Sequence, residues 1–366
     1  MAEERHYLEE RYRDGDGSRS LPMRAYYALK PLLPRRLQIA LRRRYAKRQA
    51  RTAFPAWPVE PLLVERRRAA LRTELEQRGA ERLPTIAAWP DGHRFAAILT
   101  HDVEGPAGVA NVRRIVELER RHGFVSSWNF VAEWYPIPAG LFDHVRAAGC
   151  EVGLHGIKHD CKLFESRARF ESELPAIHRY LAAWEADGFR SPATHRNADW
   201  MPELGARYDS SFPDTDPFEP QGGGCCSILP FFLGDTVELP ITLVQDHTLW
   251  EILRRDTIEL WTSKSDWIAA NGGLVNLITH PDYLDTPARL RMYEEFLAYL
   301  AEQEGCWQAL PREVASWWRT RAALRLVGDG EEGRIDGEGA ERARIEWARR
   351  EGGDLVLESE PEAVRV

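Results

Sequence analysis

Short apolar stretches alternate with longer amphipathic ones through the middle of this chain, and this alternation restricts the fold more than any other feature. Strands are predicted at 95–100, 124–131 and 150–154, and helices at about 108–122, 138–148 and 166–187. Further strands are expected near 188–190, 236–239 and 274–279, with a helix at 286–304. Strands that alternate with helices form parallel sheets. The pattern predicts a barrel or a doubly wound sheet, with functional groups at the carboxyl ends of the strands.

Two histidines follow the apolar stretch at 150–154. His155 and His159 stand four positions apart in the segment H-G-I-K-H, where glycine loosens the backbone at the end of a predicted strand. Two neutral imidazoles at this spacing can bind one cation, and a hydrolytic zinc site takes a third protein ligand. For this pair alone, solvated histidines or histidines satisfied in the core are an equally good interpretation.

A pair of carboxylates stands about fifty residues upstream. The apolar stretch at 95–100 runs directly into the segment H-D-V-E at 101–104. Alternation along an extended strand places Asp102 and Glu104 on the same side. A metal ion and a general base could share that side, and the alternative is a polar strand end or a helix cap.

Length and composition indicate a globular protein with one large hydrophobic core. The chain has 366 residues, 43% of them hydrophobic, and a net charge of −8, which argues against nucleic acid as a partner. Its five cysteines show no paired C-x-x-C spacing, so we expect no disulfide framework. The first twenty residues are charged throughout and no apolar run reaches membrane-spanning length. We therefore expect a cytoplasmic protein, and the sequence leaves its oligomeric state open.

A strongly basic helix is predicted after Pro34. Leu37, Leu41 and Tyr45 fall on one face of it, and basic residues surround that face: Arg35, Arg42, Arg43, Lys47 and Arg51. This pattern fits a helix over residues 34–51 that lies on an anionic membrane surface. The alternative is that the apolar face packs on the main domain and the arginines are solvated.

Three regions are predicted along the chain. Residues 1–89 comprise a disordered leader over about 1–20, the basic helix, a Pro-rich extended linker at 54–61 and a charged helix at 62–80. Residues 90–320 form the main domain. Residues 321–366 form a tail in which 343–347 and 354–358 pair as a β-hairpin.

Five short motifs carry a family resemblance. They are T-H-D-V-E at 100–104, H-G-I-K-H at 155–159, F-R-S-P at 189–192, Y-D-S-S at 208–211 and L-I-T-H-P at 277–281. Their order and spacing over residues 90 to 318 resemble the NodB-homology domain of the polysaccharide deacetylases, carbohydrate esterase family 4. The resemblance implies an α/β fold, a distorted and incomplete (β/α)7 barrel, with one divalent metal, usually zinc. It also implies removal of acetyl groups from N-acetylated sugars.

The same resemblance implies a role for individual residues. Asp102 matches the catalytic base, Arg190 the arginine that orients it, and His280 the histidine that protonates the leaving amine. His155 and His159 match the metal ligands. The family commonly has two adjacent carboxylates where this chain has Asp102 and Val103, so Glu104 is assigned as the third ligand, with Asp102 as the fallback. Zn2+ is the expected metal, and Co2+, Ni2+ or Fe2+ are alternatives.

Three further residues are candidates for contact with substrate. His195 and Arg196 closely follow the arginine motif, and either could bind hydroxyls or carboxylates; a loop cap is the alternative. His247 follows a predicted strand and could line the cleft, or it could be a histidine at the edge of the core. Asp209, in Y-D-S-S, is expected to cap a turn.

Three functions remain open at this point. The first is a metal-dependent N-deacetylase acting on a polysaccharide or a lipid-linked sugar precursor. The second is a hydrolase of a non-sugar amide or cyclic C–N bond on the same barrel. The third, suggested by Val103, is a catalytically silent carbohydrate-binding protein.

Overall fold

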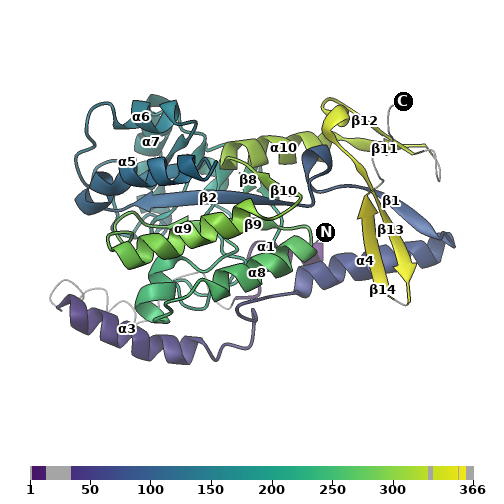
Figure 1. Cartoon of the computed structure of the whole chain (residues 1–366), viewed down its shortest axis with the longest axis horizontal. Coiled ribbons are helices and arrows are strands. Elements are labelled where there is room, and N and C mark those ends of the chain that lie inside the picture. The colour runs from purple at the N-terminus through teal and green to yellow at the C-terminus, as the bar shows by residue number, and fades with distance from the viewer. Residues whose placement is uncertain (1, 14–33, 329–332, 353, 360–366) are drawn as a thin grey trace.

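A computed structural model describes residues 2–13, 34–328, 333–352 and 354–359. A curled sheet flanked by helices forms its centre (Figure 1). Within the described chain, seven parallel strands follow one another in the order β9-β2-β3-β4-β5-β6-β8. They are β2 (Phe95–Val103), β3 (Ser127–Phe130), β4 (Glu151–Leu154), β5 (Gly188–Phe189), β6 (Tyr208–Asp209), β8 (Thr236–Glu238) and β9 (Leu274–Thr279). Two short strands extend the sheet, β7 (Phe231–Leu233) antiparallel to β8 and β10 (Cys306–Gln308) beside the start of β2.

The sheet curls until its two ends meet only in part. No ladder joins β8 to β9 among the described residues, but Leu243 N donates to Asn276 O at 3.1 Å and Asn276 Nδ2 donates to Pro240 O at 3.0 Å. Thr242 Oγ1 also donates to Leu274 O at 2.6 Å. The predicted α/β fold, an incomplete and distorted (β/α)7 barrel, is therefore confirmed.

Amphipathic helices pack on the outer face of the sheet. α5 begins at Pro106, a residue suited to a first turn, and it buries Val112, Ile115 and Val116 at helical spacing against the strands. The helices of the barrel are α5 (Pro106–Arg121), α6 (Leu141–Ala147), α7 (Arg167–Ala183), α8 (Glu259–Ala270), α9 (Pro287–Ala301) and α10 (Pro311–Ala323). Short helical turns are η2 (Pro90–Gly92), η3 (Pro192–Thr194), η4 (Met201–Leu204), the π-helix η5 (Thr248–Ile252) and η7 (Ala340–Arg342).

The alternating pattern predicts most of these elements to within a few residues, but it does not predict β6, β7, β10, α8 or α10. The main difference is β2, which continues beyond the predicted end at Thr100 to Val103. β3 and β9 pair with its two edges, so the backbone of Asp102 stays in the sheet opposite Asn129. Pairing on both edges holds polar residues in an extended conformation that their composition alone does not favour.

The start of the chain is ordered. Residues 2–8 form α1 (Ala2–Leu8), and Glu10 is buried with Arg196, whose Nε and Nη2 donate to its carboxylate at 2.8 and 2.5 Å. The prediction of a disordered leader is therefore wrong for residues 2–13. Residues 14–33, the rest of that leader and the apolar stretch after it, lie outside the described residues.

Breaking the buried Glu10–Arg196 pair is expected to destabilise the fold strongly. Arg196→Ala removes the two-pronged partner of the buried Glu10 carboxylate and leaves it only the Arg13 Nη1 contact at 3.1 Å, and loss of a buried ion-pair partner costs about 3–5 kcal/mol. Arg11→Ala is the matched control, because the Arg11–Asp199 pair is exposed and contributes about 0–1 kcal/mol. Urea denaturation of both variants measures the difference, and equal losses would show that the N-terminal segment is not held through Arg196.

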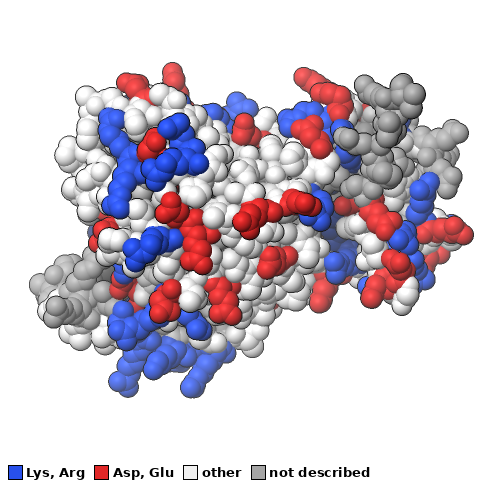
Figure 2. Space-filling model, viewed as in Figure 1, with Lys and Arg blue, Asp and Glu red and all other residues white. Residues whose placement is uncertain are grey.

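The basic helix α3 (Arg35–Gln49) is present, and its apolar row faces outward. Leu37, Leu41 and Tyr45 are 44%, 42% and 46% exposed, whereas Ala46 on the other side is 5% exposed. The alternative that this apolar row packs on the main domain is therefore wrong. Lysine and arginine side chains gather over this helix at the lower left of the molecule (Figure 2). None of the helices in the described ranges combines the length and the apolar character needed to cross a membrane.

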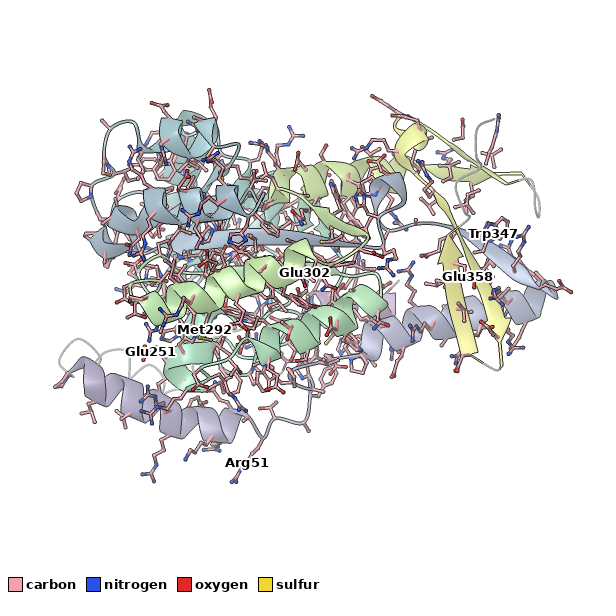
Figure 3. All side chains as sticks on the ribbon, in the orientation of Figure 1. Arg51, Glu251, Met292, Glu302, Trp347 and Glu358 are labelled. Carbon is pink, nitrogen blue, oxygen red and sulfur yellow. The ribbon has the colours of Figure 1, made fainter. Side chains whose placement is uncertain are left out.

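Both ends of the chain contribute to one small sheet beside the barrel. β1 (Arg82–Ile86), β13 (Ile345–Glu351) and β14 (Asp354–Ser359) are antiparallel, and α4 (Leu62–Arg78) packs on them through Leu75. Trp347 on β13 and Glu358 on β14 mark this sheet in Figure 3. The C-terminal hairpin and the helix near 62–80 are as predicted. The predicted division into 1–89 and 321–366 is corrected, because β1 pairs with β13; a second hairpin joins β11 (Arg325–Val327) to β12 (Arg334–Asp336).

Glu151, at the start of β4, makes stability depend on pH. Burial raises the pKa of Glu151 from 4.5 to about 7, although Tyr208 Oη donates to it at 2.5 Å. A carboxyl with a raised pKa is more easily protonated in the folded state than in the unfolded state. The free energy of unfolding therefore falls as pH rises from about 4.5 to about 7, and it stays low above that pH. Glutamine does not titrate, so Glu151→Gln is expected to remove a pH-dependent fall of about 3 kcal/mol in the free energy of unfolding. Denaturation from about pH 5 to about pH 8 measures it; parallel curves for the two proteins would contradict it.

Candidate active site

Four strands of the barrel bring predicted catalytic and metal-binding residues together at their carboxyl ends. Asp102 lies near the end of β2, His155 directly after β4, Arg190 directly after β5 and His280 directly after β9. All four side chains are buried, at 1–4% exposure. The structure thus places these candidate residues at the carboxyl ends of the strands, where the sequence predicted them.

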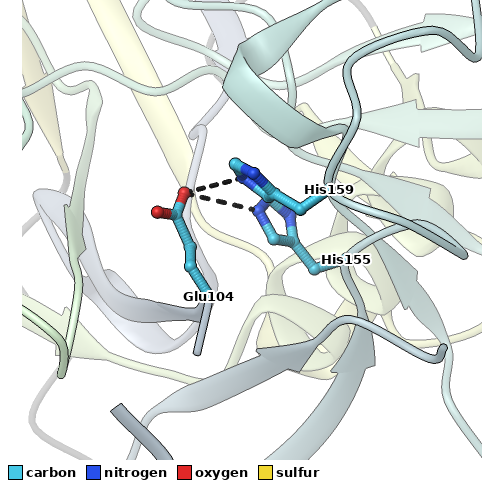
Figure 4. A group of neighbouring side chains, drawn as sticks. All are labelled: Glu104, His155 and His159. Atoms are coloured by element: carbon cyan, nitrogen blue, oxygen red, sulfur yellow. Dashed lines mark ion pairs between the residues drawn. The ribbon is translucent and has the colours of Figure 1, made fainter. Parts of the chain in front are cut away.

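Glu104, His155 and His159 form a compact group (Figure 4). Their candidate ligand atoms all lie within 4.8 Å of one another. Glu104 Oε1 is 2.8 Å from His159 Nε2 and 4.0 Å from His155 Nε2. Gly156 lies between the histidines with a φ of 71°, a conformation that favours glycine, and allows the chain to turn there. Two imidazoles and one carboxylate are a common ligand set of hydrolytic zinc sites.

The unsatisfied ring nitrogens fit a cation at this group. His155 Nε2 is buried and makes no hydrogen bond with the described protein atoms, and His159 Nε2, also buried, lies 2.8 Å from Glu104 Oε1 without the geometry of a hydrogen bond. His155 Nδ1 lies 3.0 Å from Arg190 O, and a proton on Nδ1 leaves the lone pair of Nε2 facing the group. Buried polar atoms normally have partners, so these nitrogens and the Glu104 carboxylate fit a divalent metal.

Asp102 is held as an ionised carboxylate beside this group. Asn129 Nδ2 donates to its Oδ1 at 2.9 Å, and Arg190 Nη1 donates to its Oδ2 at 3.4 Å. Burial by itself would raise the pKa of Asp102, but the charge of Arg190, together with the nearby imidazoles, outweighs it and holds this pKa below its usual value. Its Oδ2 lies 3.9 Å from His155 Nε2. An ionised carboxylate in this position can act as a base.

Arg190 is buried within the barrel and has several partners. Its Nη2 donates to Thr100 Oγ1 at 3.1 Å and to Ser210 Oγ at 3.0 Å, and its Nη1 donates to Asp102. A guanidinium held by two hydroxyls fixes the direction in which it meets a carboxylate. This geometry fits the predicted role of orienting Asp102.

His280 is oriented by a residue that sequence reasoning missed. Asp246 Oδ1 lies 2.6 Å from His280 Nδ1, and Asp246 Oδ2 accepts from the His280 backbone N–H at 2.7 Å. Burial by itself would lower the pKa of His280, but Asp246 and Glu104 raise it to about 10. His280 Nε2 lies 3.6 Å from Glu104 Oε1 and can carry a proton toward the site. The one sequence feature that could have indicated Asp246 is its position directly before His247, in the segment Q-D-H.

Asp282 is a second residue that was missed, and it fixes the backbone of Glu104. Its Oδ2 accepts from Glu104 N at 3.0 Å and its Oδ1 from Gly108 N at 3.0 Å. A Cβ at Gly108 would lie 2.1 Å from Asp282 Oδ2, so only glycine allows this approach. Asp282 therefore caps the start of α5 and sets the position from which Glu104 reaches the histidines.

The three predicted substrate residues lie in different surroundings. Arg196 donates to Glu10 and to Thr194 O with all three of its nitrogens, which argues against its predicted contact with substrate. His195 Nδ1 lies 3.1 Å from Cys161 O, and the role of His195 stays a prediction.

The ring of His247 is 5.2 Å from that of Tyr283, which in turn lies 5.4 Å from that of His280. A contact of His247 with substrate therefore also stays a prediction. Asp209 accepts from Ser211 N at 2.9 Å, as expected of a residue that caps a turn.

Comparison of three-dimensional structures identifies the fold, whereas comparison of sequences finds no match. No protein-family model and no characterised protein sequence matches the chain. A protein from Mycobacterium smegmatis assigned as a polysaccharide deacetylase is 19% identical, with a TM-score of 0.52 over 68% of this chain and 98% of that one. One from Pseudomonas aeruginosa PAO1 with the same assignment is 17% identical, with a TM-score of 0.51 over 64% and 94%. The allantoinase Puue is 16% identical, with a TM-score of 0.51 over 65% and 94%.

These structures share one architecture with the chain described here. Each of them is covered almost completely, so the likeness spans the whole barrel and not a fragment of it. The chain has the polysaccharide-deacetylase fold, as the motifs indicated.

Proposed function

We propose that this protein is a metal-dependent hydrolase that removes N-acetyl groups from a polysaccharide or a lipid-linked sugar precursor. One observation carries the proposal: Asp102 and His280 both lie within 4 Å of the group formed by Glu104, His155 and His159. A base, an acid and a set of metal ligands are the groups that amide hydrolysis needs. The similar structures assigned as polysaccharide deacetylases support a sugar as the substrate.

The metal ligands are proposed to be Glu104, His155 and His159. Zn2+ is the expected ion, with Co2+, Ni2+ or Fe2+ as alternatives, and when bound it supplies positive charge that polarises the amide carbonyl and acidifies water. Because Glu104 reaches both histidines, the fallback of Asp102 as the third ligand is not needed.

Asp102 and His280 are proposed to divide the proton transfers between them. Asp102, held by Arg190 and Asn129, takes the proton of the attacking water while the new C–O bond forms. His280, oriented by Asp246, gives a proton from Nε2 to the leaving nitrogen as the C–N bond breaks, because an amine cannot leave as an anion. The products are acetate and a free amino sugar.

Acetate release tests this proposal. Purified protein is freed of metal with a chelator, loaded with Zn2+ or Co2+ and incubated with N-acetylated oligosaccharides. We expect acetate only from the loaded protein, and Arg113→Gln, an exposed residue of α5, should match the wild type. Loaded protein that releases no acetate from any acetylated sugar would refute the proposed substrate class.

A hydrolase of a non-sugar amide or cyclic C–N bond is the second candidate. The likeness to an allantoinase has nearly the same TM-score as the likeness to the deacetylases, 0.51 against 0.52. The same base, acid and ligands would serve, since they act on the carbonyl and the nitrogen and not on the rest of the substrate. Turnover of small cyclic amides without turnover of acetylated sugars would select it.

The third candidate, a silent carbohydrate-binding protein, loses its main support. It rested on Val103, which stands where the family has a metal carboxylate, and the nearness of the Glu104 carboxylate to His155 and His159 supports Glu104 in that role instead. Metal-free protein that binds glycans unchanged would still favour it.

A further inference from the structure

A row of exposed apolar side chains runs along α3. Leu37, Leu41 and Tyr45 are four residues apart, so they lie above one another on one side of the helix. These three are among the few large hydrophobic side chains of the described chain that remain exposed. Exposure of contiguous apolar side chains to water is unfavourable, so this row indicates a surface that binds a partner or a membrane.

Basic side chains surround the row. Arg44, Lys47, Arg48 and Arg51 are all exposed, and Arg51 projects from the lower edge of the molecule (Figure 3). Residues 35–51 contain no acidic residue, although the whole chain has a net charge of −8. The segment that carries the apolar row is therefore basic in a chain that is acidic overall, and Figure 2 shows basic side chains gathered over α3 on the face in view.

The opposite side of α3 is fastened to the barrel. Arg42 Nη2 donates to Phe218 O at 2.7 Å, and Arg43 Nε donates to Glu251 O at 2.6 Å. Ala46 is buried in a small apolar cluster with Phe218 and Ile252. These contacts fix the rotation of the helix, so the apolar row cannot turn inward without breaking them.

We propose that α3 docks this protein on an anionic membrane surface. Its apolar row enters the boundary between head groups and acyl chains, and the arginines and lysine around it meet lipid phosphates. Nucleic acid would satisfy the same cations but would leave the leucines in water, so the combined pattern favours the membrane. The inference goes beyond the proposed function and does not rest on it.

The attachment of α3 also links the docking helix to the segment that follows Asp246. Glu251, which binds Arg43, belongs to η5, and η5 follows Asp246, the residue that orients His280. Arg43 Nη2 also lies 3.5 Å from the Glu251 carboxylate, to which Arg289 Nη2 donates at 2.5 Å. A short and well-held segment therefore connects the docking helix with the carboxyl end of the barrel.

Flotation with vesicles tests the apolar row. We expect full-length protein to float with phosphatidylcholine vesicles that contain phosphatidylglycerol, and not with phosphatidylcholine alone. Leu41→Ser should lower the partition coefficient about tenfold, because it removes about one buried leucine side chain. Leu326→Ser is the matched control, since Leu326 on β11 is similarly exposed, at 37%, and should leave partition unchanged.

Charge variants and a competing polyanion complete the test. Arg44→Gln with Arg48→Gln should lower partition to anionic vesicles about 30-fold, and Arg113→Gln with Arg114→Gln on α5 should not. Partition that is equal for Leu41→Ser and wild type would overturn the proposal. So would binding to duplex DNA in the absence of any binding to vesicles, since that outcome would make α3 a nucleic-acid surface.

Discussion

Replacing His155 by alanine is expected to abolish binding of a divalent metal and, with it, hydrolysis. His155 Nε2 is buried, unsatisfied and directed at Glu104 and His159, so its loss leaves two ligands on one side of the site. Residues behind metal ligands already change affinity about 10–100-fold, and loss of a ligand should exceed that range. Calorimetric titration of metal-free protein with Zn2+ measures the affinity.

His178→Ala is the control for His155→Ala. His178 is exposed on α7, and its Nε2 contacts Glu203 O at 2.9 Å, away from the ligand group. We expect this variant to bind Zn2+ as the wild type does. If His155→Ala binds one equivalent with unchanged affinity, Glu104, His155 and His159 are not the metal site.

Asp102→Asn is expected to retain the metal and lose turnover. Asparagine keeps the size of the side chain and can still contact Asn129, but it cannot take a proton from water. Loss of a general base typically lowers the rate about 10²–10⁴-fold. Metal content and kcat for acetate release, measured on the same preparation, separate the two effects.

The result for Asp102→Asn also tests how the carboxylates divide their roles. Asp199→Asn, at an exposed aspartate, is the control and should change neither metal content nor kcat. If Asp102→Asn loses its metal, Asp102 is a ligand and the assignment of Glu104 as the third ligand is wrong.

Local sequence patterns predicted the elements of the barrel because they depend on near neighbours. The apolar stretch that forms β9 and the amphipathic spacing that forms α5 are visible within a window of about ten residues. The motifs then indicated which strand ends hold the candidate catalytic and metal-binding residues. The same patterns failed at the N-terminus, where a charged composition indicated disorder but Glu10 binds Arg196, far away along the chain.

Residues that orient the catalytic groups were missed because their partners are distant in sequence. Asp246 and His280 are 34 positions apart, and Asp282 and Glu104 are 178 apart. Neither pair follows a periodic pattern, since both arise only when loops from different strands meet at one end of the barrel. Folding alone brings them within hydrogen-bonding distance.

The amino-acid sequence by itself determined the type and order of most of the barrel's strands and helices, though not β6, α8 or α10, and the positions of the acidic and histidine side chains at strand ends. Backbone preference and hydrophobic periodicity are local properties, so they can be read directly from neighbouring residues. The tertiary structure decided that Glu104 lies close to both histidines, that Arg196 forms a buried ion pair with Glu10, and that the apolar row of α3 faces outward. Those outcomes depend on which distant segments pack together, which a local pattern does not specify.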